Sequence, residues 1–528
     1  MRARARIPSL RTSAVVAAMI VAASTLALPT TPTPASTAPG ITFGAPVKLP
    51  STSAHDAALA AAGEPGIKVD SAGTIYATTV CCLLPAETFY SSDGGKTFQT
   101  MDSPGGSRQN SIGAEGDFAV DDADRVIFAD TAVADIRVSR WRDHGATWER
   151  TVDASEENPI NDRPWLGWGQ GTLYMYTNGV TGQKVHVSYD EGLTWNPVEI
   201  GNFSGFPYSL TANRQDGAVW MVSAANLQAN VLPAGSTTWN TNTVAAPARG
   251  SLSGPFGAVV ATDEAGNGYV VYSTSNNTGC DLYVSASTDH GQSWGLPMRV
   301  NANPGCATFP WIDAGDPGHI VVAWYQSDTK KSQNAMPATA TWQLHTAIST
   351  DFLSGTPSFT ETTLPNVTID TGPLNRDVWD FFQVAIGPDG RFNLVYSEDT
   401  SGGCPEPVTS AYGTCKHAWY VGQAGGPLLH ANRLAPATSV TVDAASAAGG
   451  TLSVSGSSTF KAAPSATSFS GTSATTLIGG SIKPVGPDSG ELLFTLSTPP
   501  NGTPGFDGLP GSRYGWGIKV DDVPTTSA

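Results

Sequence analysis

Seven short segments of this chain each lead into a predicted β-strand, and together they contain several carboxylates, two arginines, a tyrosine and several other aromatic side chains. Paired carboxylates suit the acid/base chemistry that breaks a glycosidic bond. An arginine fork suits a carboxylate on the ligand, and aromatic rings offer flat apolar faces to a sugar. The candidate carboxylates are Glu64, Asp117, Asp162 and Asp377, and the candidate substrate-binding residues are Arg163, Arg376, Trp165, Trp311 and Trp379.

The elements that position these residues are indicated by a turn signature, Ser-x-Asp-x-Gly-x-Thr-Trp, which recurs along the chain. Its aspartates are Asp93, Asp143, Asp190 and Asp289, at steps of 50, 47 and 99 residues, and decayed copies lie at 232–239 and 349–351. Asp and Ser side chains can bond the backbone of their own turn and Gly accepts positive φ, so these aspartates are expected to be structural. A period near 50 residues with strand-like flanks predicts a β-propeller with one blade per repeat.

A second repeat, in which a turn joins two short strands, is independent of the first. Seven such units predict a seven-bladed propeller, with a six-bladed propeller as the alternative. Segment 43–49 resembles the chain that follows the other turn signatures, such as 294–300, so we expect it to complete the last blade and close the ring. The seven turns are centred on Gly73, Asp124, Gly171, Gly217, Gly266, Gly318 and Gly390.

In such a propeller, the segments that lead into the first strand of each blade converge on the central axis. Their side chains would then surround one ligand, because several blades contribute to the same place. The alternative is a rigid plug, since proline–aromatic pairs often pack and an aspartate beside an arginine often forms a structural ion pair. Asp162, Arg163, Arg376 and Asp377 are the strongest single candidates, because charge near the axis is costly without a partner or a purpose.

The turn signature resembles the Asp box, or BNR repeat, of the sialidase superfamily. Over residues 41–430 the chain is similar to secreted bacterial exo-alpha-sialidase-like proteins. This resemblance implies a glycoside hydrolase that binds the substrate carboxylate with three arginines, and that uses a tyrosine nucleophile, an assisting glutamate and an aspartate acid/base. Tyr208 is then an available nucleophile, and Glu64, Glu115 or Asp117 could assist it or donate the proton.

The sequence departs from the sialidase pattern at the first arginine. The Phe/Tyr-Arg-Ile-Pro motif is absent, Gly63-Glu64-Pro65-Gly66 stands in its place, and only Arg163 and Arg376 lie in axial segments. Three functions are therefore kept: a sialidase-like glycoside hydrolase acting on a terminal or acidic sugar, a non-catalytic propeller that binds glycan or protein, and a polysaccharide lyase. The lyase would use Arg163 to neutralise a carboxylate, with His345 or Tyr208 as base.

The two ends of the chain differ from its middle. Residues 1–38 have a basic start, an apolar stretch at 14–28 and a candidate cleavage site at 36–38, which is typical of a secretory signal peptide and leader. The apolar stretch is too short for a transmembrane span, and no other such run exists. We therefore expect a secreted protein. The expected parts are a propeller over 41–430, a linker over 431–450 and a small accessory β domain over 451–528.

Composition and charge narrow the class of protein further. Short β-branched and aromatic runs without long helical periodicity indicate an all-β fold. The formal net charge of -17 argues against a nucleic acid or an anionic membrane as partner. The eight histidines lack zinc-ligand spacing, so no metal and no other cofactor is expected. The expected partner is carbohydrate, and the expected assembly is a monomer.

The six cysteines fit an oxidising compartment, although sequence alone does not fix their pairing. Cys81 and Cys82 are adjacent in the chain, with Cα atoms about 3.8 Å apart. A bridge there would be strained, and strain collects at binding sites; two free or separately bridged thiols are the alternative. The expected pairs are Cys404 with Cys415, Cys280 with Cys306, and Cys81 with Cys82.

Overall fold

In the computed structural model, backbone and most side chains are described between residues 40 and 434, with gaps, and only backbone is described beyond residue 434. At a few strand ends, residues 161–163 and 208 among them, the description is also limited to the backbone. Among these residues no helix is long and apolar enough to cross a membrane. The described residues are 40–50, 63–81, 84–101, 116–132, 135–154, 161–179, 182–200, 207–223, 226–244, 251–252, 257–374, 378, 380–399, 417–434, 451–454, 467–470, 477–486, 489–497 and 513–519.

Four sheets follow one another along the first half of the chain, and each consists of four consecutive antiparallel strands. The first contains β3 (Gly63–Val69), β4 (Ile75–Cys81), β5 (Leu84–Ser91) and β6 (Gln99–Thr100). The second contains β7 (Gly116–Val120), β8 (Val126–Ala132), β9 (Asp135–Arg142) and β10 (Thr147–Asp153). The third contains β11 (Asn161–Gly169), β12 (Thr172–Gly179), β13 (Gly182–Ser188) and β14 (Asn196–Glu199). The fourth contains β15 (Pro207–Ala212), β16 (Val219–Ser223), β17 (Gln228–Leu232) and β18 (Asn240–Thr243).

Two further sheets complete this part of the chain. A ten-stranded sheet contains β19 (Ser251–Leu252), β20 (Ala258–Thr262), β21 (Gly268–Asn276), β22 (Gly279–Ser287), β23 (Met298–Arg299), β24 (Cys306–Ala314), β25 (Ile320–Ser327), β26 (Thr341–Ser349), β27 (Thr360–Thr363) and β28 (Asp370–Thr371). A five-stranded sheet contains β1 (Thr42–Phe43), β2 (Val47–Lys48), β29 (Gln383–Ile386), β30 (Phe392–Glu398) and β31 (His417–Gly425).

The described residues between 40 and 434 therefore form an all-β propeller, as predicted, but the number of separate sheets differs from the expected number of blades. Five sheets are separate blades of four or five strands, and the sixth sheet is composite. The composite arises where β22 and β24 pair in parallel through Cys280 and Cys306, which links two antiparallel meanders. The sequence predicts seven blades, with six as the alternative, but the described residues show only five blades as sheets of their own.

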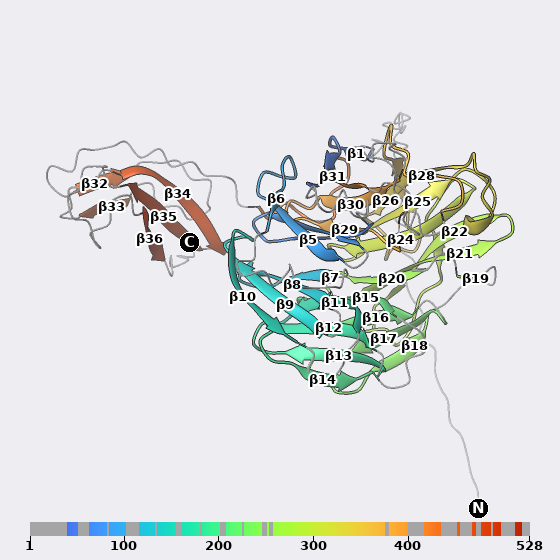
Figure 1. The fold of residues 1–528 in the computed structure, drawn as a ribbon, viewed down its shortest axis with the longest axis horizontal. Helices are drawn as coiled ribbons and strands as arrows, with labels where there is room; N and C mark the ends of the chain where they lie inside the picture. Colours follow the sequence, from blue (N-terminus) through green and yellow to red (C-terminus); the bar gives the residue numbers. More distant parts are fainter. Residues whose placement is uncertain are drawn as a thin grey trace, which may run out of the picture. The chain divides into compact units, whose positions relative to one another are not determined.

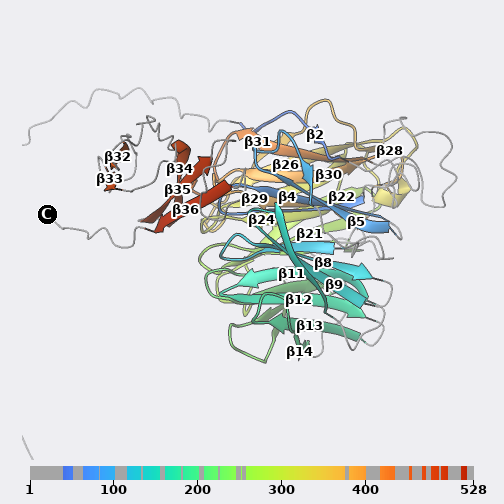
Figure 2. The same cartoon turned by 60° about the vertical axis from the view of Figure 1, so that its left-hand side comes forward.

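The innermost strands of the sheets form a closed series of contacts. Strand β3 contacts β7, which contacts β11, and the series continues through β15, β20, β24 and β29 back to β3. In both Figure 1 and Figure 2, strands β11 to β14 run in order from the middle of the propeller to its rim. Strands β16 and β25 are buried along their whole length, because neighbouring blades cover both faces of each sheet.

The two ends of the propeller are joined by the N-terminal strands. Strand β1 pairs antiparallel with β31 through Phe43 and Gln423, and β2 pairs with the same strand through Val47 and Tyr420. The segment after residue 40 therefore supplies the outer strand of the last blade. This confirms the closure that was expected from the sequence of residues 43–49, and it removes an exposed sheet edge.

The recurring turns are held by the hydrogen bonds that their sequence predicts. Asp190 Oδ1 accepts from the backbone N–H of Thr194 at 2.8 Å, and its Oδ2 accepts from the Thr194 hydroxyl at 2.6 Å. Asp93 and Asp289 make the same pair of contacts at 3.0 and 2.6 Å and at 2.9 and 2.5 Å. Asp143 accepts from the Thr147 hydroxyl at 2.9 Å. Each aspartate thus fixes a tight turn by local contacts within four residues.

These turns make an acid-dependent contribution to stability. Hydrogen bonds from the Thr97 hydroxyl and backbone lower the pKa of Asp93 to about 2. Because the folded pKa is depressed, the contribution is present above pH 4 and is lost as the pH falls towards 2. We expect Asp93→Asn to lower the melting temperature at pH 7 and to converge with the wild type near pH 2. The exposed Asp153→Asn is the control, and parallel curves for wild type and Asp93→Asn would contradict the prediction.

The predicted disulfide between Cys280 and Cys306 is present in the structure and closes a loop of 26 residues. Replacing both cysteines by serine should lower the free energy of unfolding by about 3 kcal/mol, because the unfolded chain regains the entropy of the open loop. Urea unfolding with and without reductant measures this loss. A double variant as stable as the oxidised wild type would show that the bond adds nothing.

The other expected cysteine pairs remain predictions. Cys81 ends β4, where only its backbone is described, and Cys82, Cys404 and Cys415 lie outside the described residues. The expected signal peptide and leader over 1–38 lie outside them as well, as does the expected linker over 431–450 beyond residue 434.

The C-terminal residues contain two small sheets in their described part. One pairs β32 (Thr451–Val454) with β33 (Thr467–Ser470), and the other orders β34 (Leu477–Gly486), β35 (Ser489–Ser497) and β36 (Arg513–Lys519) antiparallel. All five strands lie within residues 451–528, for which the sequence predicts a small accessory β domain.

Candidate functional site

Four innermost strands depart from regular pairing close to their first residues, at the face of the propeller that we call the leading face. The register shifts within 63–66 of β3, 162–165 of β11, 207–210 of β15 and 308–311 of β24. Such bulges bend a strand and redirect its side chains, and they occur often beside active sites. The bulged segments contain Glu64, Arg163, Tyr208 and Phe309, of which the first three are sequence-predicted site residues.

Glu64 is the most unusual of these residues. It is 1% exposed and has a left-handed backbone with φ of 46°, a conformation that Phe309 repeats with φ of 53°. For residues other than glycine this backbone costs about 1–3 kcal/mol, and it persists where surrounding structure imposes it. Strain of this kind clusters at sites of function, so a buried carboxylate on a strained bulge marks Glu64 as the leading candidate.

An aromatic cluster fills the propeller axis beside these bulges. The rings of Trp165, Trp311 and Phe381 lie 5.0 to 5.8 Å apart, centre to centre. Trp165 is on β11 and Trp311 is on β24, two strands that are not neighbours in the ring, so the rings meet across the axis. None of the three side chains is more than 6% exposed. The cluster therefore resembles the rigid plug that the sequence offers as the alternative to a ligand site.

Asp117 makes a contact that joins two blades. The backbone N–H of Leu166 on β11 donates to Asp117 Oδ2 at 3.0 Å, and burial raises the pKa of this carboxyl, although the charge of Lys68 opposes the shift. Two other side chains of innermost strands also accept a hydrogen bond from the backbone of a neighbouring blade. Gln383 Oε1 accepts from Ile67 N–H at 3.0 Å, and Asp313 Oδ2 accepts from Ile386 N–H at 2.8 Å.

These contacts assign Asp117 a structural role between blades, and its predicted catalytic role stays a prediction. Sequence reasoning missed Asp313 and Gln383, because their partners are 73 and 316 residues away in the chain.

His345, the base of the lyase alternative, is enclosed within a blade. Its Nδ1 lies 3.0 Å from Glu361 Oε1, its Nε2 lies 3.3 Å from the Thr363 hydroxyl, and its ring packs on Trp324 at 5.5 Å between centres. The side chain is 5% exposed. A buried ring with both nitrogens engaged does not suit a base that must reach a ligand at the axis.

The remaining predicted site residues can be placed only in part. Asp162 and Arg163 begin β11, and Tyr208 lies in β15, but their side chains are not described. Arg376, Asp377 and Trp379 lie outside the described residues, as does Glu115. The structure therefore brings Trp165 and Trp311 together and puts Glu64, Arg163 and Tyr208 in bulges of three innermost strands.

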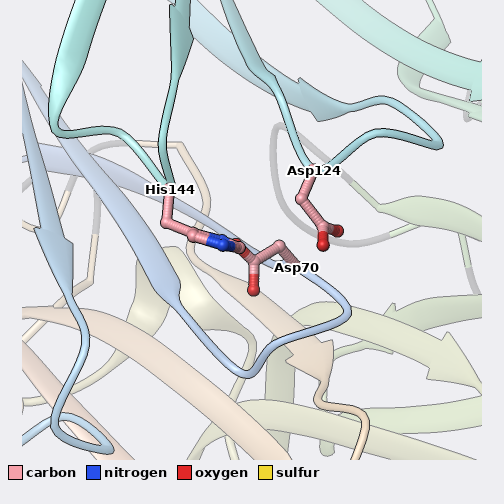
Figure 3. Close-up of side chains that lie close together, drawn as sticks. All are labelled: Asp70, Asp124 and His144. Carbon is pink, nitrogen blue, oxygen red and sulfur yellow. The ribbon is translucent and has the colours of Figure 1, made fainter. Parts of the chain in front are cut away.

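Three side chains in turns of the first two blades have the composition of a small metal site. Asp70, Asp124 and His144 offer ligand atoms within 4.8 Å of one another (Figure 3). Asp70 already accepts from Thr74 N–H at 2.8 Å and from the Tyr76 hydroxyl at 2.8 Å, and its Oδ2 lies 2.6 Å from His144 Nδ1.

Asp263 makes the corresponding turn contacts without a histidine. It accepts from the Tyr269 hydroxyl at 2.6 Å and from Asn267 N–H at 3.0 Å. Turn structure therefore accounts for the position of Asp70, and His144 adds a contact from the next blade.

Comparisons with known proteins identify no family. No protein-family model and no curated protein matches this chain. Among solved structures, YCF48 from Cyanidioschyzon merolae is 12% identical, with 72% of this chain and 99% of that chain covered and a TM-score of 0.42. The GH93 alpha-L-arabinofuranosidase of Fusarium graminearum is 12% identical, with 72% and 97% covered and a TM-score of 0.38. The NanB sialidase from Streptococcus pneumoniae is 10% identical, with 72% and 70% covered and a TM-score of 0.37. Similarity at this level carries no argument about activity, and the strand topology alone establishes the propeller.

Proposed function

We propose that this chain is a secreted, sialidase-like glycoside hydrolase that acts on a terminal or acidic sugar at the leading face of its propeller. The observation that carries the proposal is Glu64, a buried carboxylate held in left-handed backbone on a bulge of an innermost strand. A carboxylate in such surroundings is suited to proton transfer, because burial keeps water away and a rigid backbone fixes its position.

The neighbouring bulges supply residue types that complement this carboxylate. In the proposed site, Glu64 acts as acid/base or assists Tyr208, which is the nucleophile, and Arg163 binds a carboxylate on the sugar. Asp162, Arg376, Asp377 and Trp379 come from segments that lead into innermost strands, and they are proposed to complete the site. Trp165 and Trp311 form its floor. No cofactor is needed for this chemistry.

Hydrolysis of an aryl sialoside by the oxidised mature chain tests the proposal. We expect turnover by the wild type and its loss in Arg163→Ala, since the guanidinium would no longer hold the substrate carboxylate. Arg142→Ala is the matched control, because this arginine has a half-exposed side chain in surface ion pairs. No turnover by a folded wild type would refute the sialidase reaction, and neutral aryl glycosides would then be tested in the same assay.

A non-catalytic propeller that binds glycan is the second candidate function. The buried aromatic plug of Trp165, Trp311 and Phe381 favours this function. Asp117 is engaged in a structural contact, so Glu64 is the one carboxylate on the bulges whose side chain is described. Calorimetric titration with sialylated and neutral oligosaccharides separates the two functions. Saturable binding without turnover would favour the binding protein.

We further propose that the propeller has seven blades. The ten-stranded sheet then counts as two blades, β20–β23 and β24–β27, which the pair of Cys280 and Cys306 links. The closed series of innermost-strand contacts supports this count, since it contains one strand from each proposed blade.

The proposed limits of the parts are a secretory leader over 1–38, the propeller over 41–430, a linker over 431–450 and an accessory β domain over 451–528. Sequencing the N-terminus of the exported protein tests the leader. Light scattering tests the proposed monomer.

A further inference from the structure

The chain does not leave the propeller where its last strand ends. We infer that residues 427–434, here called the strap, lock the propeller ring across its turn face, the face that carries the turns between the first and second strands of the blades. The strap would then extend the propeller from residue 430 to residue 434, so that the proposed linker would begin after residue 434, and it would close the ring a second time beside β1 and β2. This inference does not depend on the proposed function.

Backbone hydrogen bonds fasten the strap to turns of two sheets. The N–H of Asp316, in the turn between β24 and β25, donates to Leu429 O at 2.9 Å. The N–H of Leu429 donates to Gly390 O at 2.8 Å, and the N–H of Arg433 donates to Pro388 O at 2.6 Å, both in the turn between β29 and β30. Alternating bonds of this kind hold the strap as a structured segment and not as a free linker.

Two glycines allow the strap to approach so closely. A Cβ atom on Gly315 would lie 2.3 Å from Leu429 O, and a Cβ atom on Gly390 would lie 2.1 Å from His430 O. These distances are far below van der Waals contact with backbone atoms that cannot move aside. Leu429 is fully buried, so its side chain adds apolar packing at the same place.

Charge and side-chain contacts extend the strap to further turns. The Arg433 guanidinium pairs with Asp316 at 3.2 Å and also with Glu264, which lies in the turn between β20 and β21. A Cβ atom on Gly73, in the turn between β3 and β4, would lie 3.4 Å from the Leu434 side chain. The strap thus spans from β20 to β3 and crosses the junction between the last and first sheets.

This position gives the strap a mechanical role. Strands β1 and β2 fasten the outer edge of the last sheet, whereas the strap fastens the turn face of the same junction. Separation of the first and last sheets would have to break both. The leading face, with its bulges, is then the face of the axis that the strap leaves uncovered.

Two glycine variants of the full chain test the inference. Gly390→Ala and Gly171→Ala both put alanine into left-handed backbone, with φ of 77° and 74°, in the turn between first and second strands. A Cβ atom on Gly171 meets nothing within 4 Å, so only Gly390→Ala disturbs the strap. We expect the melting temperature of Gly390→Ala to fall at least about 3 °C further than that of Gly171→Ala. Equal losses would overturn the inference.

A second pair of variants keeps the inference testable if Gly390→Ala does not fold. Leu429→Ala removes the buried anchor of the strap, and Leu428→Ala removes a neighbouring leucine that is 37% exposed. We expect hydrogen exchange at the amides of Asp316 and Arg433 to become at least about tenfold faster in Leu429→Ala than in Leu428→Ala. The same exchange rates in both variants would overturn the inference.

Discussion

Glu64→Gln should lower kcat/KM for the aryl glycoside by about 10²–10⁴-fold, because a carboxamide has the size of the acid but cannot transfer a proton. The left-handed backbone and the buried position of Glu64 should be retained, since glutamine matches glutamate in shape. Steady-state kinetics across pH measures the effect. We expect the loss in kcat and not in KM, because the proton is transferred only in the reaction step, and a merely structural residue would not divide its effect in this way.

Glu191→Gln provides a matched control for this variant. Glu191 also has left-handed backbone, with φ of 61°, but it lies in a recurring turn and pairs with Arg125 and Arg140. We expect its activity to equal that of the wild type. A folded Glu64→Gln protein with full activity would remove Glu64 from the reaction.

The propeller fold could be predicted because its defining contacts are local. In each recurring turn, Asp190 and its equivalents bond atoms no more than four residues away, so the Ser, Asp, Gly and Thr that make the turn are visible at fixed spacing. The closure by β1 and β2 could also be predicted, because residues 43–49 have the same pattern as other outer strands. Both signals depend on backbone geometry that the local sequence encodes.

The organisation of the sheets and of the axis could not be predicted in the same way. The composite sheet depends on one parallel pair between β22 and β24, which no local sequence pattern predicts. The bonds of Asp117 to Leu166 and of His345 to Glu361 depend on how strands pack side by side. The left-handed backbone of Glu64 likewise follows from the bulge in β3, since a Gly-Glu-Pro sequence alone permits extended backbone.

The candidate residues of the leading face include side chains that could face a ligand and side chains that pack on another blade, and sequence spacing does not separate the two kinds. Sequence spacing selected residues that share a position in the repeat, and Glu64, Arg163 and Tyr208 do share bulged positions in three strands. It could not distinguish a side chain that faces a ligand from one that packs on another blade, because that depends on neighbours across the ring. Trp165 is the residue for which this distinction matters most.

Trp165→Ala should lower the free energy of unfolding by about 3–5 kcal/mol, because it opens a cavity where the rings of three innermost segments meet. Trp165 is 2% exposed and contacts both Trp311 and Phe381, so its neighbours can collapse only partly into the space. Urea unfolding measures the loss. Tyr189→Ala is the control, since Tyr189 is 73% exposed and should change stability by no more than about 0.5 kcal/mol.

A second substitution separates packing from ligand binding at the same residue. Trp165→Phe keeps an aromatic ring in the plug and should restore most of the stability that Trp165→Ala loses. If Trp165 only plugs the axis, Trp165→Phe should bind oligosaccharide like the wild type; if it is also the floor of the site, affinity should fall while stability is kept. A Trp165→Ala protein as stable as the wild type would contradict the plug altogether, because the axial cluster would then contribute no packing energy.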